Sequence, residues 1–203
     1  MTEELISAVT LAETRAQMVT AVKNLAAAKD PKAISTLIAV FGYNNPAAAM
    51  VALDALTELG EIAVPQLLEH IDDYNYGARA YSIRTLAAIA DPRALDVLIT
   101  VAATDFAPSV RRAAAKGLGN LHWHKLSFPE NKTAINRALD TLLLISQDTD
   151  WSIRYAAVVG LQALAKIADV QQSILTRLKQ MLANDVEKAV RARIQLAYTN
   201  CGF

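Results

Sequence analysis

The sequence of 203 residues is 53% hydrophobic and 20% charged, with seven glycines and six prolines. It is too apolar for a disordered chain and too poor in glycine and proline for a turn-rich β-protein, while its abundant alanine and leucine favour helix. Twenty basic residues balance twenty acidic ones, which argues against nucleic acid or an anionic membrane as a partner.

The chain contains one cysteine, Cys201, which excludes a disulfide framework and a paired metal–thiolate motif. Its first residues, MTEELISAVTLAETRAQ, include acids and lack an apolar segment of signal-peptide length. No window approaches the roughly 18 uncharged apolar residues of a membrane-spanning helix. We therefore expect a cytoplasmic protein.

The first elements along the chain are predicted to be helices with marked starting points. An apolar stripe in residues 1–28 is followed by DPKAISTLI (30–38), EIAVPQLL (61–68) and DPRALDVLI (91–99). Each of these three phrases places an acid, or Asp followed by Pro, before an apolar run. Asp as the N-cap with Pro at the first helical position is a signal for a helix start.

A second phrase alternates with the first along the chain. GARAYSIRTLAAI (77–89), SVRRAAAKGLGNL (109–121) and SIRYAAVVGLQAL (152–164) align with one another, and AVRARIQLAY (189–198) is a truncated copy. Each copy has an arginine six residues after an aspartate, in the pairs Asp73 and Arg79, Asp105 and Arg111, Asp148 and Arg154, and Asp185 and Arg191. Identical spacing in every unit is what a scaffold needs, so we expect Arg111 and Arg154 to bond across successive units.

The two phrases together make a helical hairpin of about 30 residues. We predict an all-α fold: a HEAT-like α-solenoid forming a right-handed superhelix of about five helical hairpins plus a half-unit, in a single domain spanning 1–203. The spacing lengthens between Val110 and Ile153, which places an irregular insertion at 122–135, HWHKLSFPENKTAI. Small residues in the second phrase are expected to let adjacent helices approach closely; they are Ala114, Gly117, Ala157 and Gly160.

Two of the three histidines lie at the start of the insertion, in HWH. On a helix, His122 and His124 would point in different directions because they are two residues apart. A third metal ligand would have to come from the distant His70 or Cys201, so we expect no metal site. The sequence also has no glycine-rich phosphate loop and no nucleophile elbow.

Aromatic and arginine side chains gather at the ends of the expected helices. Tyr74 and Tyr76 precede the phrase at 77–89, and Trp151 precedes the phrase at 152–164. The second helices of a solenoid line its concave face, which would place these rings beside Arg79 and Arg154. The rings are either core aromatics at the edge of the solenoid or a groove for a flat, anionic, conjugated ligand.

The stretches YNYGARAYSIRTLAAIADPRALDVLI and DFAPSVRRAAAKGLGNLHW resemble the E/F-type phycobilin lyases of cyanobacteria. These are HEAT-like proteins that attach open-chain tetrapyrroles to cysteines of phycobiliproteins. NYGARA, DPRAL and DFAPSVRRAA are more specific than general HEAT patterning. The resemblance extends well over residues 43–165 and more loosely to the termini, and the chain is short, as the F subunits are.

The resemblance implies an enzyme that is active only with a homologous E-type subunit. It implies phycocyanobilin as the substrate, no cofactor, and the apo phycocyanin α subunit as the acceptor, whose cysteine forms a thioether with the bilin. Because the acceptor supplies the thiol, Cys201 is not expected to react. From placement and residue chemistry, the candidate catalytic residues are Tyr74, His122 and His124. The candidate bilin ligands are Tyr76, Arg79, Trp123, Trp151 and Arg154.

Two other functions stay open from the sequence. A non-enzymatic HEAT adaptor would use the same scaffold and would have no affinity for bilin. A related phycobilisome-degradation factor would bind subunits that already carry the chromophore, and would detach bilin.

Overall fold

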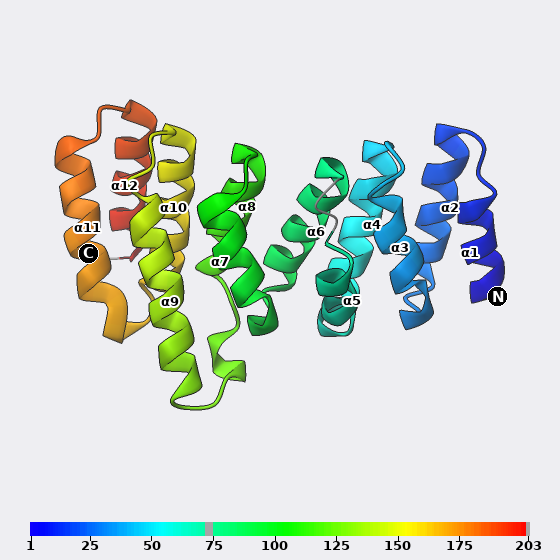
Figure 1. Ribbon diagram of the computed structural model, residues 1–203, viewed down its shortest axis with the longest axis horizontal. Coiled ribbons are helices and arrows are strands. Elements are labelled where there is room, and N and C mark those ends of the chain that lie inside the picture. The colour runs from blue at the N-terminus through cyan, green and yellow to red at the C-terminus, as the bar shows by residue number, and fades with distance from the viewer. Residues whose placement is uncertain (72–74, 202–203) are drawn as a thin grey trace. The chain divides into compact units, whose positions relative to one another are not determined.

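The computed structural model describes residues 1–71 and 75–201, and every regular element in these two ranges is a helix (Figure 1). The chain divides into two compact units, an N-terminal unit (Met1–Ile89) and a C-terminal unit (Ala90–Phe203). Each unit is built from helical hairpins whose helices pack in two layers. The all-α, HEAT-like solenoid is therefore confirmed, whereas a single domain over 1–203 stays a prediction.

The described part of the N-terminal unit contains three helical hairpins. They are α1 (Thr2–Thr10) with α2 (Arg15–Ala27), α3 (Ile34–Val40) with α4 (Pro46–Leu59), and α5 (Val64–Glu69) with α6 (Tyr76–Ile89). The second helices pack in succession, α2 on α4 and α4 on α6. Leu25, Leu56 and Leu86, one from each of these three helices, are fully buried and supply the core of this layer.

The described part of the C-terminal unit also contains three hairpins. They are α7 (Leu95–Thr104) with α8 (Pro108–Leu118), α9 (Glu130–Ile145) with α10 (Trp151–Leu164), and α11 (Ala168–Asn184) with α12 (Lys188–Cys201). One layer is formed by α7, α9 and α11, and the other by α8, α10 and α12. Leu118, Leu142 and Leu161 are fully buried between the layers.

The last hairpin is complete, which differs from the predicted half-unit. The helix α12 packs against both α10 and α11. The sequence did not mark α11 because this helix begins after Ile167 with no side-chain capping bond and no Asp-Pro phrase. Packing of its apolar face, through Val170, Ile174 and Leu178, fixes the helix instead.

Asp-Pro phrases start two of the hairpins, as predicted. The side chain of Asp30 accepts a hydrogen bond from the amide of Lys32 at 3.0 Å, and Asp91 accepts one from Arg93 at 2.9 Å. The prolines that follow open short 3₁₀ turns, Pro31–Ala33 and Pro92–Ala94, which lead into α3 and α7.

The irregular segment between α8 and α9 is shorter than the predicted insertion at 122–135. It contains a 3₁₀ turn, Trp123–Lys125, and ends where α9 begins at Glu130. The helix α9 therefore includes the last residues of the expected insertion. Its apolar face is buried there through Ala134, Ile135 and Ala138, which follow the helical period.

Two glycines allow α8 and α10 to approach closely. A Cβ atom on Gly119 would lie 2.1 Å from the carbonyl oxygen of Gly160, and one on Gly160 would lie 2.5 Å from the carbonyl oxygen of Ala115. Both obstacles are backbone atoms, which no side-chain rotation can move. The expected role of Gly160 is confirmed, and Gly119 is a second contact that the sequence analysis did not single out.

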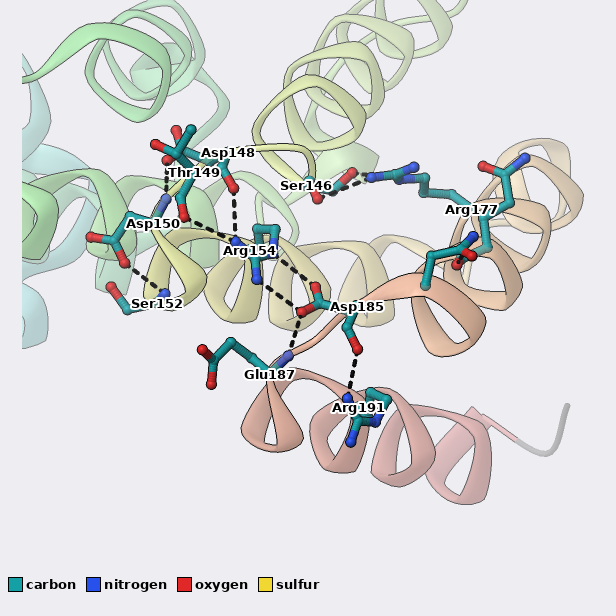
Figure 2. A network of polar contacts seen from close by, with 12 residues as sticks. Ser146, Asp148, Thr149, Asp150, Ser152, Arg154, Arg177, Asp185, Glu187 and Arg191 are labelled. Atoms are coloured by element: carbon teal, nitrogen blue, oxygen red, sulfur yellow. Dashed lines mark hydrogen bonds and ion pairs between the residues drawn. The ribbon is translucent and has the colours of Figure 1, made fainter.

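A ladder of arginine–aspartate pairs joins successive hairpins of the C-terminal unit. The Nη2 atom of Arg111 lies 2.7 Å from Oδ2 of Asp148. Arg154 holds Asp185 with two hydrogen bonds, Nε to Oδ2 and Nη2 to Oδ1, both 2.8 Å (Figure 2). The predicted bonding across units is confirmed for these two steps, while Asp73 lies outside the described residues.

Each aspartate of this ladder also closes a turn of its own. The Oδ1 atom of Asp148 accepts the amide of Asp150 at 2.8 Å, and that of Asp185 accepts the amide of Glu187 at 3.0 Å. One carboxylate therefore shapes the start of a helix and binds the guanidinium of the preceding hairpin. The Arg154–Asp185 pair is largely buried, with side chains 14% and 5% exposed.

We expect Arg154→Ala to lower the free energy of unfolding by about 2–3 kcal/mol, because it leaves the carboxylate of Asp185 buried without its cation. Urea denaturation followed by circular dichroism measures the change. Arg137→Ala is the matched control, since Arg137 pairs with Asp96 on the surface, where the side chains are 50% and 80% exposed. The control should cost less than about 1 kcal/mol; equal losses would show that the ladder does not hold the hairpins together.

Acid should weaken the same ladder. The hydrogen bonds from Arg154 hold the pKa of Asp185 below its ordinary value. A carboxyl whose folded-state pKa is depressed contributes stability that is present above its unfolded pKa of about 4 and is lost as pH falls through the folded pKa. Unfolding free energies measured from pH 7 to pH 2 should therefore fall below about pH 4. Asp185→Asn should make that fall shallower, and an unchanged slope would contradict the prediction.

Gly119→Ala should lower the free energy of unfolding by about 1–3 kcal/mol, because the added methyl group must displace the backbone of α10. Gly77→Ala is the control: its Cβ would meet only the side chain of Asn75 at 3.4 Å, in ordinary contact. That variant should keep or slightly raise stability, since alanine is the better helix former. Thermal unfolding of both variants decides whether close approach is required here.

Candidate functional site

The residues His122, Trp123 and His124 lie just beyond the end of α8. The backbone amide of His122 donates to the carbonyl oxygen of Ala90 at 2.8 Å, which holds the segment against the turn before α7. The segment is a 3₁₀ turn and not a helix continuation, so the two imidazole rings do not diverge as expected on a helix. Their centroids lie 5.7 Å apart, with the planes tilted by 44°.

Two polar ring atoms in this segment are buried. Within the described ranges, the Nδ1 atom of His122 and the Nε1 atom of Trp123 are shielded from water and have no hydrogen-bond partner. A buried N–H group without a partner is unfavourable, and native proteins rarely leave one without a reason. Because both atoms are inaccessible from the surface, a ligand could bond them only after the segment rearranges.

Trp151 and Arg154 lie on the first turn of α10. The indole of Trp151 is half-exposed, as a stacking surface requires. All three nitrogen atoms of the Arg154 guanidinium donate hydrogen bonds to protein oxygens. Its Nη1 atom donates to the carbonyl oxygens of Asp148, at 2.9 Å, and Thr149, at 3.1 Å, and its other donors hold Asp185. A ligand carboxylate would have to compete with Asp185 for this guanidinium.

The structure does not bring these two groups of residues together. Two contacts show that α8 and α10 run parallel. Arg112 near the start of α8 bonds Ser152 near the start of α10, at 3.0 Å, and Gly119 meets Gly160 further along both helices. With a rise of about 1.5 Å per residue, the length of α8 separates the two ends by about 16 Å. The segment His122–His124 therefore lies at the edge of the C-terminal unit where α8 ends. Trp151 and Arg154 lie at the opposite edge, where α10 begins.

In the N-terminal unit, Tyr76 and Arg79 share the first turn of α6. Tyr76 is half-exposed and Arg79 is buried, with the guanidinium carbon 6.0 Å from the centre of the Tyr76 ring. This spacing allows a cation–π contact. Tyr74, the remaining candidate, lies outside the described residues.

The end of α11 carries a site that the sequence analysis missed. A hollow of about 540 Å³ opens between the ends of α9 and α11 and the start of α10. Its lining residues are Ser146, Gln147, Asp148, Arg154, Arg177, Gln180, Met181, Asn184, Asp185 and Val186. Arg177 was missed because it lies outside the repeated phrase, and no local pattern marks it.

No helix in the described ranges has both the length and the apolar character needed to cross a membrane.

Comparison with known proteins agrees with this architecture. Residues 64–134 match the family described as HEAT repeats. The chain is 75% identical over 197 residues to the phycocyanobilin lyase subunit beta of Nostoc sp. (strain PCC 7120), covering 97% of this chain and 98% of that protein. It is 45% identical over 201 residues to the phycocyanin alpha phycocyanobilin lyase CpcF of Synechocystis sp. (strain PCC 6803), covering 98% and 94%.

A solved structure of the complex of CpcE and CpcF of phycocyanin lyase from Nostoc sp. PCC7120 contains a similar chain. The match has a TM-score of 0.81 and 78% sequence identity, and it covers 83% of this chain and 99% of that chain. Such identities, with coverage of nearly the full length of the curated relatives, show the family and not only the fold. The chain belongs to the phycocyanobilin lyase β-subunit family, the family of CpcF.

Proposed function

We propose that this chain is the F-type subunit of a heterodimeric lyase that joins phycocyanobilin, through a thioether, to a cysteine of the phycocyanin α subunit. The observation that carries the proposal is the 45% identity, over 98% of the chain, to a relative named as a phycocyanin alpha phycocyanobilin lyase. The motifs NYGARA, DPRAL and DFAPSVRRAA resemble the same family and are consistent with this function.

The partner is an E-type subunit. The similar solved chain belongs to a complex of CpcE with CpcF, and at 78% identity the binding surface is expected to be shared. A solenoid leaves apolar surface at the ends of its array unless something covers it. Leu11, beside α1, and Leu196, on α12, are such exposed apolar side chains.

The reaction adds the thiol of the acceptor cysteine across a double bond of the bilin A-ring. A sulfur–carbon bond forms, the double bond is consumed, and the thiol proton ends on the bilin, so no oxidant or reductant is needed. The lyase has to hold the bilin, favour its protonated, electrophilic form and present one face to the thiolate. Imidazole is the side chain most often used for such proton transfers, which favours His122 and His124.

The remaining candidates suit the binding of a flat conjugated chain. The rings of Trp123 and Trp151 supply stacking surfaces, and Tyr76 adds a ring in the N-terminal unit. Arg79 and Arg154 stay proposed as ligands of the propionates; at Arg154 the propionate competes with Asp185 for the guanidinium. A cytoplasmic location belongs to the same proposal.

Co-expression of this chain with an E-type subunit, the phycocyanin α subunit and the enzymes of phycocyanobilin synthesis tests the function. A lyase gives an α subunit that keeps red absorption after denaturation, because the bilin is covalently bound. A non-enzymatic adaptor gives no covalent colour, and a degradation factor removes bilin from an α subunit that already carries it.

The HWH segment yields a sharper prediction. Replacing His122 and His124 together by alanine should slow chromophore transfer at least about tenfold, a rise of about 1.4 kcal/mol in the barrier, because proton transfer is lost. Folding and partner binding should stay nearly intact, since His122 is only partly buried and His124 is exposed. His70→Ala is the control, because His70 is the third histidine and its ring bonds the local carbonyl of Gln66, at 2.8 Å.

Transfer rates are measured with purified heterodimer, bilin and apo α subunit, after thermal unfolding has verified each variant. If the double variant transfers bilin at the parental rate, the prediction is wrong and the segment has only a structural role.

A further inference from the structure

The hollow at the ends of α9 and α11 contains one arginine that is bonded only to neutral groups. The Nε atom of Arg177 donates to the hydroxyl of Ser146 at 2.7 Å, and Nη2 donates to the carbonyl oxygen of the same residue at 3.0 Å (Figure 2). Among the residues that the structure describes, no carboxylate forms an ion pair with Arg177. Both N–H groups of Nη1 and one of Nη2 therefore remain available.

The carboxylates that line the hollow are already neutralised. Asp148 is paired with Arg111 and Asp185 with Arg154, so the charge of Arg177 is left over. Burial lowers the pKa of Arg177 somewhat, although a guanidinium stays protonated at any pH at which proteins are stable. The hollow thus presents one guanidinium that Asp185 influences through its charge but that no carboxylate contacts directly, and such a group in a partly desolvated place can bind an anion.

The two bonds to Ser146 also fix the orientation of the guanidinium. Ser146 is fully buried at the end of α9, so it anchors the Nε edge of Arg177 to the scaffold. The remaining edge, formed by Nη1 and Nη2, is the fork that binds a carboxylate with two parallel hydrogen bonds. Because an anchored fork loses little side-chain entropy on binding, this arrangement is preorganised.

The surroundings of the fork are neutral and continue past it. Gln147 and Gln180 border the hollow, and the same two residues with Arg177 border a neighbouring hollow of about 500 Å³. Arg177 therefore lies in the middle of an elongated surface groove over α9 and α11. Its walls offer amide groups and the apolar side chains of Leu143 and Met181. An extended ligand with one carboxylate, hydrogen-bonding heteroatoms and apolar faces fits these features.

We propose that this groove is a bilin subsite in which Arg177 binds one propionate of the tetrapyrrole. The proposal rests on the proposed function, which supplies a ligand of this chemistry. A single spare charge among neutral amides matches a carboxylate better than a doubly charged phosphate. Arg177 is thus a binding residue additional to those predicted from the sequence, and unlike Arg154 it does not have to be released from a carboxylate first.

Equilibrium binding to the purified heterodimer, followed by bilin absorption, tests the subsite with two probes, phycocyanobilin and its dimethyl ester. The ester keeps the conjugated chain and lacks the propionate charge. The unmodified heterodimer should bind the acid about tenfold more tightly than the ester, and Arg177→Met should remove most of that preference. Arg177→Lys should keep part of it, because lysine retains the charge without the fork.

Arg137→Met is the matched control: Arg137 is an exposed arginine of α9 paired with Asp96, and its loss should leave the preference unchanged. The ratio of the two affinities is measured on one protein sample, so partial unfolding of a variant does not alter it.

An unchanged acid-to-ester ratio in Arg177→Met would overturn the subsite. If that variant instead bound the E-type subunit or the α subunit more weakly, the carboxylate at Arg177 would belong to a protein partner, which also rejects the proposal. A parental heterodimer that binds and transfers no bilin would overturn the proposed function and the subsite together. Normal transfer with an unchanged ratio would overturn the subsite alone.

Discussion

The aspartate at the start of each second helix is the group on which the C-terminal unit depends. Asp185 shows why: one oxygen atom accepts the amide that opens α12, and both oxygens receive the guanidinium of Arg154 from the preceding hairpin. A carboxylate bound to a backbone amide and to a bidentate arginine has little freedom left. The turn and the joint between hairpins are therefore formed together, and neither is complete without the other.

Three arginines of the unit show two different environments. Arg111 and Arg154 have charges that are cancelled inside the scaffold, whereas Arg177 is oriented by neutral groups and keeps its charge for the surface. Close packing of α8 on α10 through Gly119 and Gly160 keeps the helices parallel, so that side chains at their two ends are held apart at a fixed distance. The scaffold can thus present separate contacts to a long ligand without a deep pocket.

The repeated elements were predictable from the sequence because their causes are local. Asp30 and Asp91 cap turns through amides two residues away. In the other phrase, Asp105, Asp148 and Asp185 are each followed by an arginine six residues later, a spacing that the turn and the helix start set locally. The hairpin of α11 and α12 was only half predicted, since burial of Val170 and Ile174 replaces a capping phrase at its start. The same limit applies to Arg177, whose role depends on Ser146, 31 residues earlier in the chain. The ring positions of His122 and His124 follow from a 3₁₀ turn that no propensity marked.

The arginine–aspartate ladder also has a direction along the chain, so that a hairpin depends on the one that follows it. Each arginine reaches forward to the aspartate of the next hairpin, so a chain shortened after Leu164 would keep Arg154 and lose Asp185. The new end would carry a guanidinium held only by backbone carbonyls, and the turn around Asp148 would have to support it. Arg191 is the next arginine of this series, and it bonds the carbonyl oxygen of Asp185. In the C-terminal unit, each following hairpin thus brings the acid that pairs with the arginine before it, which ties the order of these repeats to their sequence.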